Sequence, residues 1–459
     1  MKTTIRIALL TATIAAMLLA GCAPQPAATP AATAPPQATT PPEPTTPPEE
    51  PTEPAAPAEP VTINYWSMWN ESEAQGTVIK QAIADFQAAN PNITVNVTWN
   101  GRENRNLVIP AIESGGIIDV FDTGDEWIIA HATQYAADME SLLDDPAIGA
   151  AGKSVRDTIM PALLYNFPVD GKAIMMPYQP YAVLWFYNKD HFTDAGITEE
   201  PKTWADLMDA CQALKDAGHP CITTDVDAYV DILWGYYAER AFDGCQAVRD
   251  AMADKTGELW RDPMWLQMAK DYAALSADGY LLKGTEGNLY PAGQQSLALG
   301  EVTMYLNGTW LPSEVQETAG PEFHWGSFSF PNVTDGKGAF THVMMGSQAL
   351  VIVNKSEHPA EAWEFIKWMV SKDVQQAMCD TANVPAVHTE ATWPETLAEA
   401  QQVVLNADRG LTWGCDIWTS DVSAIVLDLF GKLFTGQITP EEYVEQLVKG
   451  TADYWAAQE

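Results

Sequence analysis

The chain has few positive charges. Lysine and arginine together number 24, against 61 aspartates and glutamates, which gives a formal net charge of -37 at pH 7. Nucleic-acid binding needs clustered lysine and arginine to contact phosphates, so this composition argues against a nucleic-acid partner. Acidity of this size can attract a cationic ligand, but a solvated acidic surface explains it equally well. Charge therefore excludes one class of partner and selects none.

The chain also lacks the motifs of common catalytic sites. It has no glycine-rich phosphate loop, no Gly-x-Ser-x-Gly turn and no His-Glu-x-x-His helix, and its seven histidines are scattered. The adjacent carboxylates Asp125 and Glu126 are a poor match for a glycosidase, whose two carboxyl groups flank one bond from different segments. We expect a protein that is not an enzyme and that uses no cofactor and no metal ion.

Long apolar runs are absent after the first twenty residues. That first run follows the basic residues Lys2 and Arg6, is too short to span a bilayer comfortably, and ends in small residues, as a cleaved export signal does. The tetrapeptide 19–22, Leu-Ala-Gly-Cys, resembles the bacterial lipoprotein box, in which the cysteine receives lipid. The sequence therefore predicts a signal peptide over residues 1–22. It also predicts an extracytoplasmic protein held to the cell membrane by lipid at Cys22 rather than by a spanning helix.

Residues 23–60 are built almost wholly from proline, alanine, threonine, glutamine and glutamate, and hold fourteen of the 32 prolines. Such a segment cannot bury enough apolar surface to fold, and proline stiffens it toward polyproline II. We predict a disordered tether.

Cysteine is scarce. Five cysteines remain besides Cys22, and none of their spacings resembles a zinc site. An exported protein can form disulfides, and Cys379 with Cys415 is the preferred pair because both lie in the C-terminal region. Cys211 with Cys221 is the alternative, although Cys211 is expected in the middle of a helix and thus too far from Cys221.

From Val61 onward the hydrophobic pattern is that of an α/β protein. Apolar residues alternate over 61–65, recur at helical spacing over 79–86, and alternate again over 93–99. A strand, a helix and a strand with short joins form a βαβ unit, which implies a parallel sheet. Thr203 and Thr439 are predicted N-caps of later helices, and Gly218 is a predicted helix end.

Tryptophan is abundant, with seventeen copies. More than half are expected in cores, among them Trp204, Trp363 and Trp368. Others lie in polar loops, where broad rings suit sugars: axial C–H groups stack on the ring face and hydroxyls bond to nearby amides and carboxylates. The same ring faces also bind quaternary or polyamine cations.

Several motifs resemble those of the family 1 extracellular solute-binding proteins, the carbohydrate receptors of ABC importers, which include maltose- and glycerol-3-phosphate-binding proteins. The segments that carry the resemblance are, in chain order, residues 114–120, 170–178, 186–192, 201–207, 306–310 and 361–366. The first departs from the family pattern because Ile118 stands where proline is usual. The resemblance spans essentially residues 61–459.

The family's fold implies two α/β lobes of the periplasmic-binding-protein type II kind, joined by several hinge crossings with the ligand between them. By this similarity, lobe 1 covers residues 61–179 and 346–383, and lobe 2 covers residues 180–345 and 384–459.

The same similarity places ligand contacts in the loops that follow the first strands, at the crossings, in the second lobe and in the C-terminal region. The implied ligand-binding residues are Trp66, Trp69, Asn70, Glu71, Arg102, Glu103, Asp125, Glu126, Trp127, Tyr181, Trp310, Gly346, Trp413 and Trp418.

The resemblance implies a monomeric receptor that captures a carbohydrate by lobe closure and delivers it to membrane permease subunits. Few lysines or arginines lie in the expected cleft loops, which favours a neutral mono- or oligosaccharide over a phosphorylated ligand. One alternative is a receptor of the same architecture for a cationic solute such as a polyamine or betaine. A surface glycosidase is the more distant alternative.

Overall fold

The computed structural model describes residues 59–459 except 167 and 170, and these fall in one compact unit. The predicted export signal, the predicted lipid attachment at Cys22 and the predicted tether up to residue 58 lie outside the described residues. Within them, no helix is both long and apolar enough to cross a bilayer.

One mixed sheet runs through the unit, in the order β2-β1-β3-β10-β6-β8-β7, with β11 paired to β10 and β9 paired to β6. Its strands are β1 (Val61–Ser67), β2 (Ile93–Trp99), β3 (Val120–Gly124), β6 (Met176–Asn188), β7 (Ile222–Thr223), β8 (Met304–Gly308), β9 (Trp325–Phe328), β10 (His342–Ile352) and β11 (Arg409–Leu411). A small separate ladder pairs β4 (Pro168–Val169) with β5 (Lys172–Ala173). β1 pairs in parallel with both β2 and β3, so the predicted βαβ unit and the α/β class are confirmed.

The long strands β6 and β10 link the two ends of this sheet. The first half of β6 pairs with β10, while its second half pairs with β8 and β9. β10 in turn pairs with β3 at its far end. Both strands cross from one hydrophobic core to the other, and residues on both belong to each core.

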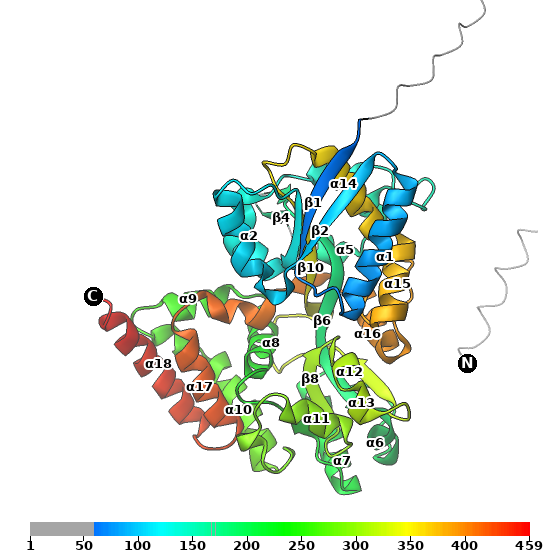
Figure 1. Ribbon diagram of the computed structural model, residues 1–459. Helices are drawn as coiled ribbons and strands as arrows, with labels where there is room; N and C mark the ends of the chain where they lie inside the picture. The colour runs from blue at the N-terminus through cyan, green and yellow to red at the C-terminus, as the bar shows by residue number, and fades with distance from the viewer. Residues whose placement is uncertain (1–58, 167, 170) are drawn as a thin grey trace, which may run out of the picture. The chain divides into compact units, whose positions relative to one another are not determined.

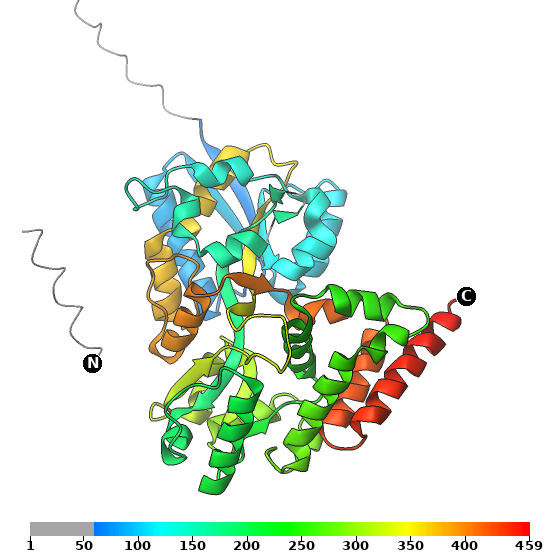
Figure 2. The same cartoon turned by 180° about the vertical axis from the view of Figure 1, so that it is seen from behind.

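Helices cover the sheet around the first core. α1 (Ala74–Ala89), α14 (Pro359–Met369) and α15 (Lys372–Ala382) pack together on one face, and α2 (Asn104–Glu113) lies on the other (Figures 1 and 2). The remaining elements on this side are α3 (Asp125–Trp127), α4 (Val155–Thr158), α5 (Pro161–Asn166) and α16 (Ala398–Leu405). The apolar spacing predicted for residues 79–86 forms the buried stripe of α1.

Around the second core the helices pack mainly on one another. The larger ones are α7 (Trp204–Ala217), α8 (Val230–Phe242), α9 (Gln246–Ala253), α10 (Pro263–Ala277), α17 (Ser423–Phe434) and α18 (Pro440–Ala456). The shorter ones are α6 (Lys189–Asp194), α11 (Ala292–Ala298), α12 (Leu311–Glu314) and α13 (Gln316–Ala319). Capping boxes at Thr203 and Thr439 begin α7 and α18, and Gly218 with φ 93° ends α7, as predicted.

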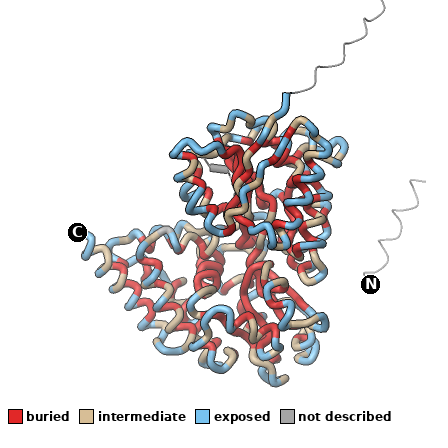
Figure 3. The backbone as a smooth tube through the Cα atoms, in the orientation of Figure 1, coloured by how far each residue is buried: buried red, intermediate tan, exposed pale blue. Residues whose placement is uncertain are grey.

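Burial follows the central strands and the inner faces of the helices (Figure 3). Nine of the seventeen tryptophans are buried, which confirms that most fill cores. Trp204 and Trp363 are among them, and Trp368 is half-buried with its ring 5.9 Å from that of Phe86. The first core also includes Val384, Trp393 and Val404. The lobe boundaries themselves stay a prediction.

The preferred disulfide was wrong. Cys211 pairs with Cys221, and Cys245 pairs with Cys415, each with a Cα–Cα distance of 5.1 Å. Cys379 is a buried free thiol in α15, and burial raises its pKa to about 12. The alternative pair, Cys211 with Cys221, forms because the chain turns sharply at Gly218 directly after α7, and this brings Cys221 back beside the helix.

Candidate functional site

A cavity of about 810 Å³ lies where α3 and the turn after it, the middle of β6, the end of β8, β10 and the segment after β11 meet. Because those elements come from opposite ends of the sheet, the cavity sits at the junction of the two cores. Its volume is within the usual range for small-molecule sites.

Aromatic rings form much of the cavity wall. The rings that line it are Trp127, Tyr181, Trp310, Trp413 and Trp418. Trp310 is central: its ring centroid lies 5.5 Å from that of Tyr181 and 6.0 Å from that of Trp413, to which it is nearly parallel at 19°. Trp418 is 59% exposed and extends the aromatic surface outward.

The position of Trp310 explains why the motif of residues 307–310, Asn-Gly-Thr-Trp, contains a glycine. Its ring passes over Gly308 so closely that a Cβ there would lie 2.3 Å from ring atoms. The Asn307 side chain accepts a hydrogen bond from the Gly308 N–H at 2.7 Å, and the Thr309 hydroxyl accepts one from the Ala182 N–H at 3.3 Å. This turn at the end of β8 therefore needs glycine, and it directs the indole into the cavity.

Polar groups complete the wall. The polar side chains that line the cavity are Arg105, Glu126, His131, Gln179, Thr309, Gln348, Thr412 and Asp416. Asp416 is ion-paired with Arg249, so the remaining charged side chains, Arg105 and Glu126, are one of each sign. Asp125 lies behind the wall. Its burial is the largest cause of its raised pKa, and the neighbouring Glu126 raises that pKa further.

Three oxygens in this region have no hydrogen-bond donor among the described residues: Asp125 Oδ1, Gln179 Oε1 and Gln348 Oε1. Gln179 and Gln348 lie opposite each other on β6 and β10. Unpaired buried acceptors are costly, so a ligand or a small rearrangement that brings hydroxyl or N–H donors to them is favourable.

Six of the fourteen predicted site residues line this cavity: Glu126, Trp127, Tyr181, Trp310, Trp413 and Trp418. Asp125 and Gly346 lie just behind it. A Cβ on Gly346 would approach the Tyr181 hydroxyl to 2.4 Å and Asp125 Oδ2 to 2.7 Å, so this position must stay small for both side chains to fit.

Six predicted residues do not line the cavity: Trp66, which lies within β1 and not in the loop after it as predicted, and the five from the loops after β1 and β2. Asn70, Glu71, Arg102 and Glu103 are exposed. Glu71 pairs with Lys80, and Glu103 accepts a hydrogen bond from Asn106 at 2.9 Å. The role of these residues in ligand binding stays a prediction.

The tryptophans of that group, Trp66 and Trp69, pack inward. Trp66 is half-buried against the first core. Trp69 is buried, donates from Nε1 to the Tyr178 hydroxyl at 2.6 Å, and is covered by the Arg102 guanidinium 4.4 Å above its ring. Tyr178 in turn donates to Asp122. The family similarity placed both tryptophans at the ligand. The local sequence does not reveal the tyrosine and the carboxylate that reach Trp69 from distant strands.

Among the polar residues that line the cavity, seven were not predicted as ligand contacts: Arg105, His131, Gln179, Thr309, Gln348, Thr412 and Asp416. Gln179 and Gln348 lie on the strands that join the cores, where a polar side chain inside a long apolar strand was the one available signal. Thr309 lies inside the motif of residues 306–310, and the other four carry no local signal.

The buried carboxylate of Asp122, which accepts a hydrogen bond from Tyr178, should make the stability of the fold depend on pH. Burial raises its pKa from 3.8 to about 6, with the Tyr178 and Met68 hydrogen bonds opposing the shift. Between these two pKa values the folded protein holds a proton that the unfolded chain has lost. We therefore expect the free energy of unfolding to fall by roughly 3 kcal/mol as pH rises from about 4 to 7 because of this group.

In Asp122→Asn this component of the pH dependence is expected to vanish. Urea unfolding of the wild type and of Asp122→Asn across that pH range measures this component. Asp85→Asn, at an exposed aspartate, is the matched control. Parallel stability–pH curves for the wild type and Asp122→Asn would contradict the assignment.

Two α/β cores joined by long shared strands, with an aromatic cavity at their junction, define a two-lobed solute-binding protein. The chain belongs to the bacterial extracellular solute-binding protein family, whose model matches residues 70–376. The predicted family and fold class are confirmed.

The relatives agree with this assignment. The multiple sugar-binding protein of Streptococcus mutans is 24% identical over 336 residues, which cover 71% of this chain and 74% of that protein. The apo form of RafE from Streptococcus pneumoniae superposes with a TM-score of 0.69 at 22% identity, over 87% of this chain and 99% of RafE, and RafE has also been solved in complex with raffinose. A chitin oligosaccharide binding protein gives a TM-score of 0.62 at 21% identity, over 86% and 99% of the two chains. The two structural matches establish the fold.

Proposed function

We propose that this protein is the substrate-binding receptor of an ABC importer and that it captures a neutral mono- or oligosaccharide. The observation that carries the proposal is the cavity wall, where Trp310 stacks on Trp413 and meets Tyr181 edge-to-face, beside polar side chains of both charge signs. Such rings complement the C–H faces of pyranoses, and amides, carboxylates and guanidinium groups complement their hydroxyls. Relatives with saccharide ligands in their names add support.

The charge at the cavity favours a neutral ligand. Asp416 is neutralised by Arg249, and Arg105 offsets Glu126. A phosphorylated ligand needs a cluster of cationic donors, and among the described lining residues Arg105 is the one lysine or arginine. A polyamine needs an excess of carboxylates, whereas each of the two lining carboxylates, Glu126 and Asp416, is offset by an arginine.

The mechanism follows from the two cores. Ligand contacts from elements of both cores are complete in a closed form, so ligand shifts the population toward closure. The closed receptor then docks on membrane permease subunits and releases its cargo. A lipid at Cys22 and the proline-rich tether would keep the receptor near them, because tethering raises local concentration.

The test is a binding screen of the purified protein against raffinose, chitotriose, xylotriose, spermidine, glycine betaine and glycerol 3-phosphate. We expect a saccharide to raise the melting temperature by mass action and to bind in calorimetry with an affinity that barely changes with salt. Tight spermidine binding that weakens as salt increases would favour the cationic alternative. Turnover of a chromogenic glycoside would overturn the receptor assignment in favour of a glycosidase.

A further inference from the structure

The segment that follows β11 brings two tryptophans to the cavity. We call residues 412–418 the aromatic arm. Both Trp413 and Trp418 line the cavity, and Trp413 lies nearly parallel to Trp310 with ring centroids 6.0 Å apart. The arm thus extends the surface of Trp310 from the cavity wall to the exposed Trp418.

The backbone of the arm adopts a conformation that it does not favour by itself. Three consecutive residues, Gly414, Cys415 and Asp416, have positive φ angles of 57°, 54° and 64°. Side chains other than glycine rarely adopt this region, and a run of three persists only when surrounding contacts enforce it. Contacts from outside the arm must therefore set where its two indoles lie.

The first such contact is a buried carboxylate. Asp231, 2% exposed in the first turn of α8, accepts hydrogen bonds at Oδ2 from the Nε1 atoms of both Trp413 and Trp418, at 2.5 and 2.8 Å. Its Oδ1 accepts from the Ile232 N–H at 2.9 Å. A carboxylate near a helix N-terminus is favoured by the free amides there, and charge-assisted bonds are the stronger kind. One side chain therefore orients both rings.

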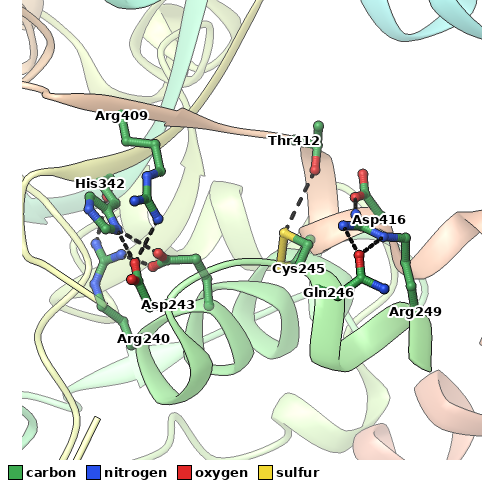
Figure 4. The surroundings of a disulfide bond; sticks show 11 residues. Arg240, Asp243, Cys245, Gln246, Arg249, His342, Arg409, Thr412 and Asp416 are labelled. Atoms are coloured by element: carbon green, nitrogen blue, oxygen red, sulfur yellow. Dashed lines mark hydrogen bonds and ion pairs between the residues drawn. A yellow bond between two sulfur atoms is a disulfide. The ribbon is translucent and has the colours of Figure 1, made fainter. Parts of the chain in front are cut away.

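The second contact is covalent. The disulfide between Cys245 and Cys415 ties the centre of the arm to the turn that joins α8 to α9. Arg249 of α9 forms an ion pair with Asp416, the next residue of the arm, and Figure 4 shows the guanidinium directed at both Asp416 and Gln246.

The third contact is close backbone packing. A Cβ on Gly235 of α8 would lie 2.3 Å from the carbonyl carbon of Gly414, so the arm rests directly on the helix surface. Each of these contacts joins the arm to α8 or α9, and neither helix lines the cavity.

We propose that Asp231 and the Cys245–Cys415 disulfide are positioning residues that hold the aromatic arm as a preformed extension of the ligand surface, and that the arm selects oligosaccharides over single sugars. This inference rests on the proposed function. Of the two rings of the arm, Trp413 lies within the central cluster, with its centroid 6.2 Å from that of Tyr181 and 6.0 Å from that of Trp310. Trp418, 59% exposed, adds area beyond this cluster that only a longer ligand covers. Pre-organised rings bind without an ordering cost at the moment of binding.

The variants are Asp231→Asn and the double substitution Cys245→Ala/Cys415→Ala. Their matched controls in the same core are Asp271→Asn, a carboxylate that accepts from Tyr237 and Gln267, and Cys211→Ala/Cys221→Ala, the other disulfide. None of the control residues lines the cavity.

Calorimetry with raffinose, chitotriose and xylotriose, and with galactose, N-acetylglucosamine and xylose, compares long with short ligands. For the trisaccharide that the wild type binds, we expect each test variant to lose about tenfold or more in affinity, the effect of removing support from interface anchors. The monosaccharide should be affected less, because it does not reach Trp418, and the controls should bind both ligands as the wild type does. Equal losses for long and short ligands, or losses in the controls of the same size, would overturn the selective role.

A second readout needs no ligand. The indole N–H resonances of Trp413 and Trp418, assigned with Trp413→Phe and Trp418→Phe, should be protected from exchange in the wild type and in Asp271→Asn, and lose protection in Asp231→Asn. Unchanged protection would overturn the positioning role of Asp231. If the wild type binds no saccharide at all, the proposed function fails, and these resonances still decide whether Asp231 holds the arm.

Discussion

Trp310→Ala is expected to weaken saccharide binding by about 30- to 1000-fold, the range of roughly 2–4 kcal/mol typical of a central tryptophan in a binding site. The indole packs against both Tyr181 and Trp413, with ring centroids 5.5 and 6.0 Å away, so its loss removes its own ring surface and one packing partner from each of these two residues. Isothermal calorimetry with the best ligand of the screen measures the effect.

The fold should survive this substitution because Trp310, just after the end of β8, is only half-buried. Trp455→Ala is the matched control: that indole is also half-buried and donates to the Met252 carbonyl at 2.9 Å, but it lies on α18 and does not line the cavity. Binding by Trp310→Ala at wild-type affinity would remove this residue from the site.

Cys245→Ala/Cys415→Ala is expected to lower the free energy of unfolding by up to about 5 kcal/mol, whereas Cys211→Ala/Cys221→Ala lowers it by up to about 3 kcal/mol. The first disulfide joins residues 170 apart and the second joins residues 10 apart. A cross-link removes more conformational freedom from the unfolded chain when the loop it closes is longer.

Urea unfolding of the two double variants and the wild type, all under oxidising conditions, gives the comparison. The total free energy of unfolding of a domain is about 5–15 kcal/mol, so a loss of this size lowers the urea concentration at the unfolding midpoint substantially. A larger loss from the short loop than from the long one would contradict the chain-entropy argument for this protein.

Much of the fold was predictable because it depends on neighbours along the chain. The alternation of apolar residues over 61–65 and 93–99 corresponds to β1 and β2, and the helical spacing over 79–86 corresponds to α1. The caps at Thr203 and Thr439 depend on side chains three residues away, which the sequence places directly. These are short-range relations, and residue spacing determines them.

Part of the site was predictable for a different reason. Trp310 follows a buried strand and a glycine over which its ring passes, and family resemblance directs attention to that position. Trp69 also follows a strand, yet its indole is used by Tyr178, which is 109 residues away, in a network that includes Asp122. Which face of a loop points to the cavity depends on partners that arrive from other strands.

The sequence by itself determined the α/β class, the family, the order of most elements and the wealth of aromatic residues from which a sugar site can be built. Only the tertiary structure decided which rings meet, which cysteines pair and which carboxylate orients the aromatic arm. The reason is physical: Asp231 with Trp413 and Trp418, and Cys245 with Cys415, are contacts across more than 160 residues. Such contacts form only once the segment after β11 packs on α8 and α9 in the second core, and no local pattern of residues encodes them.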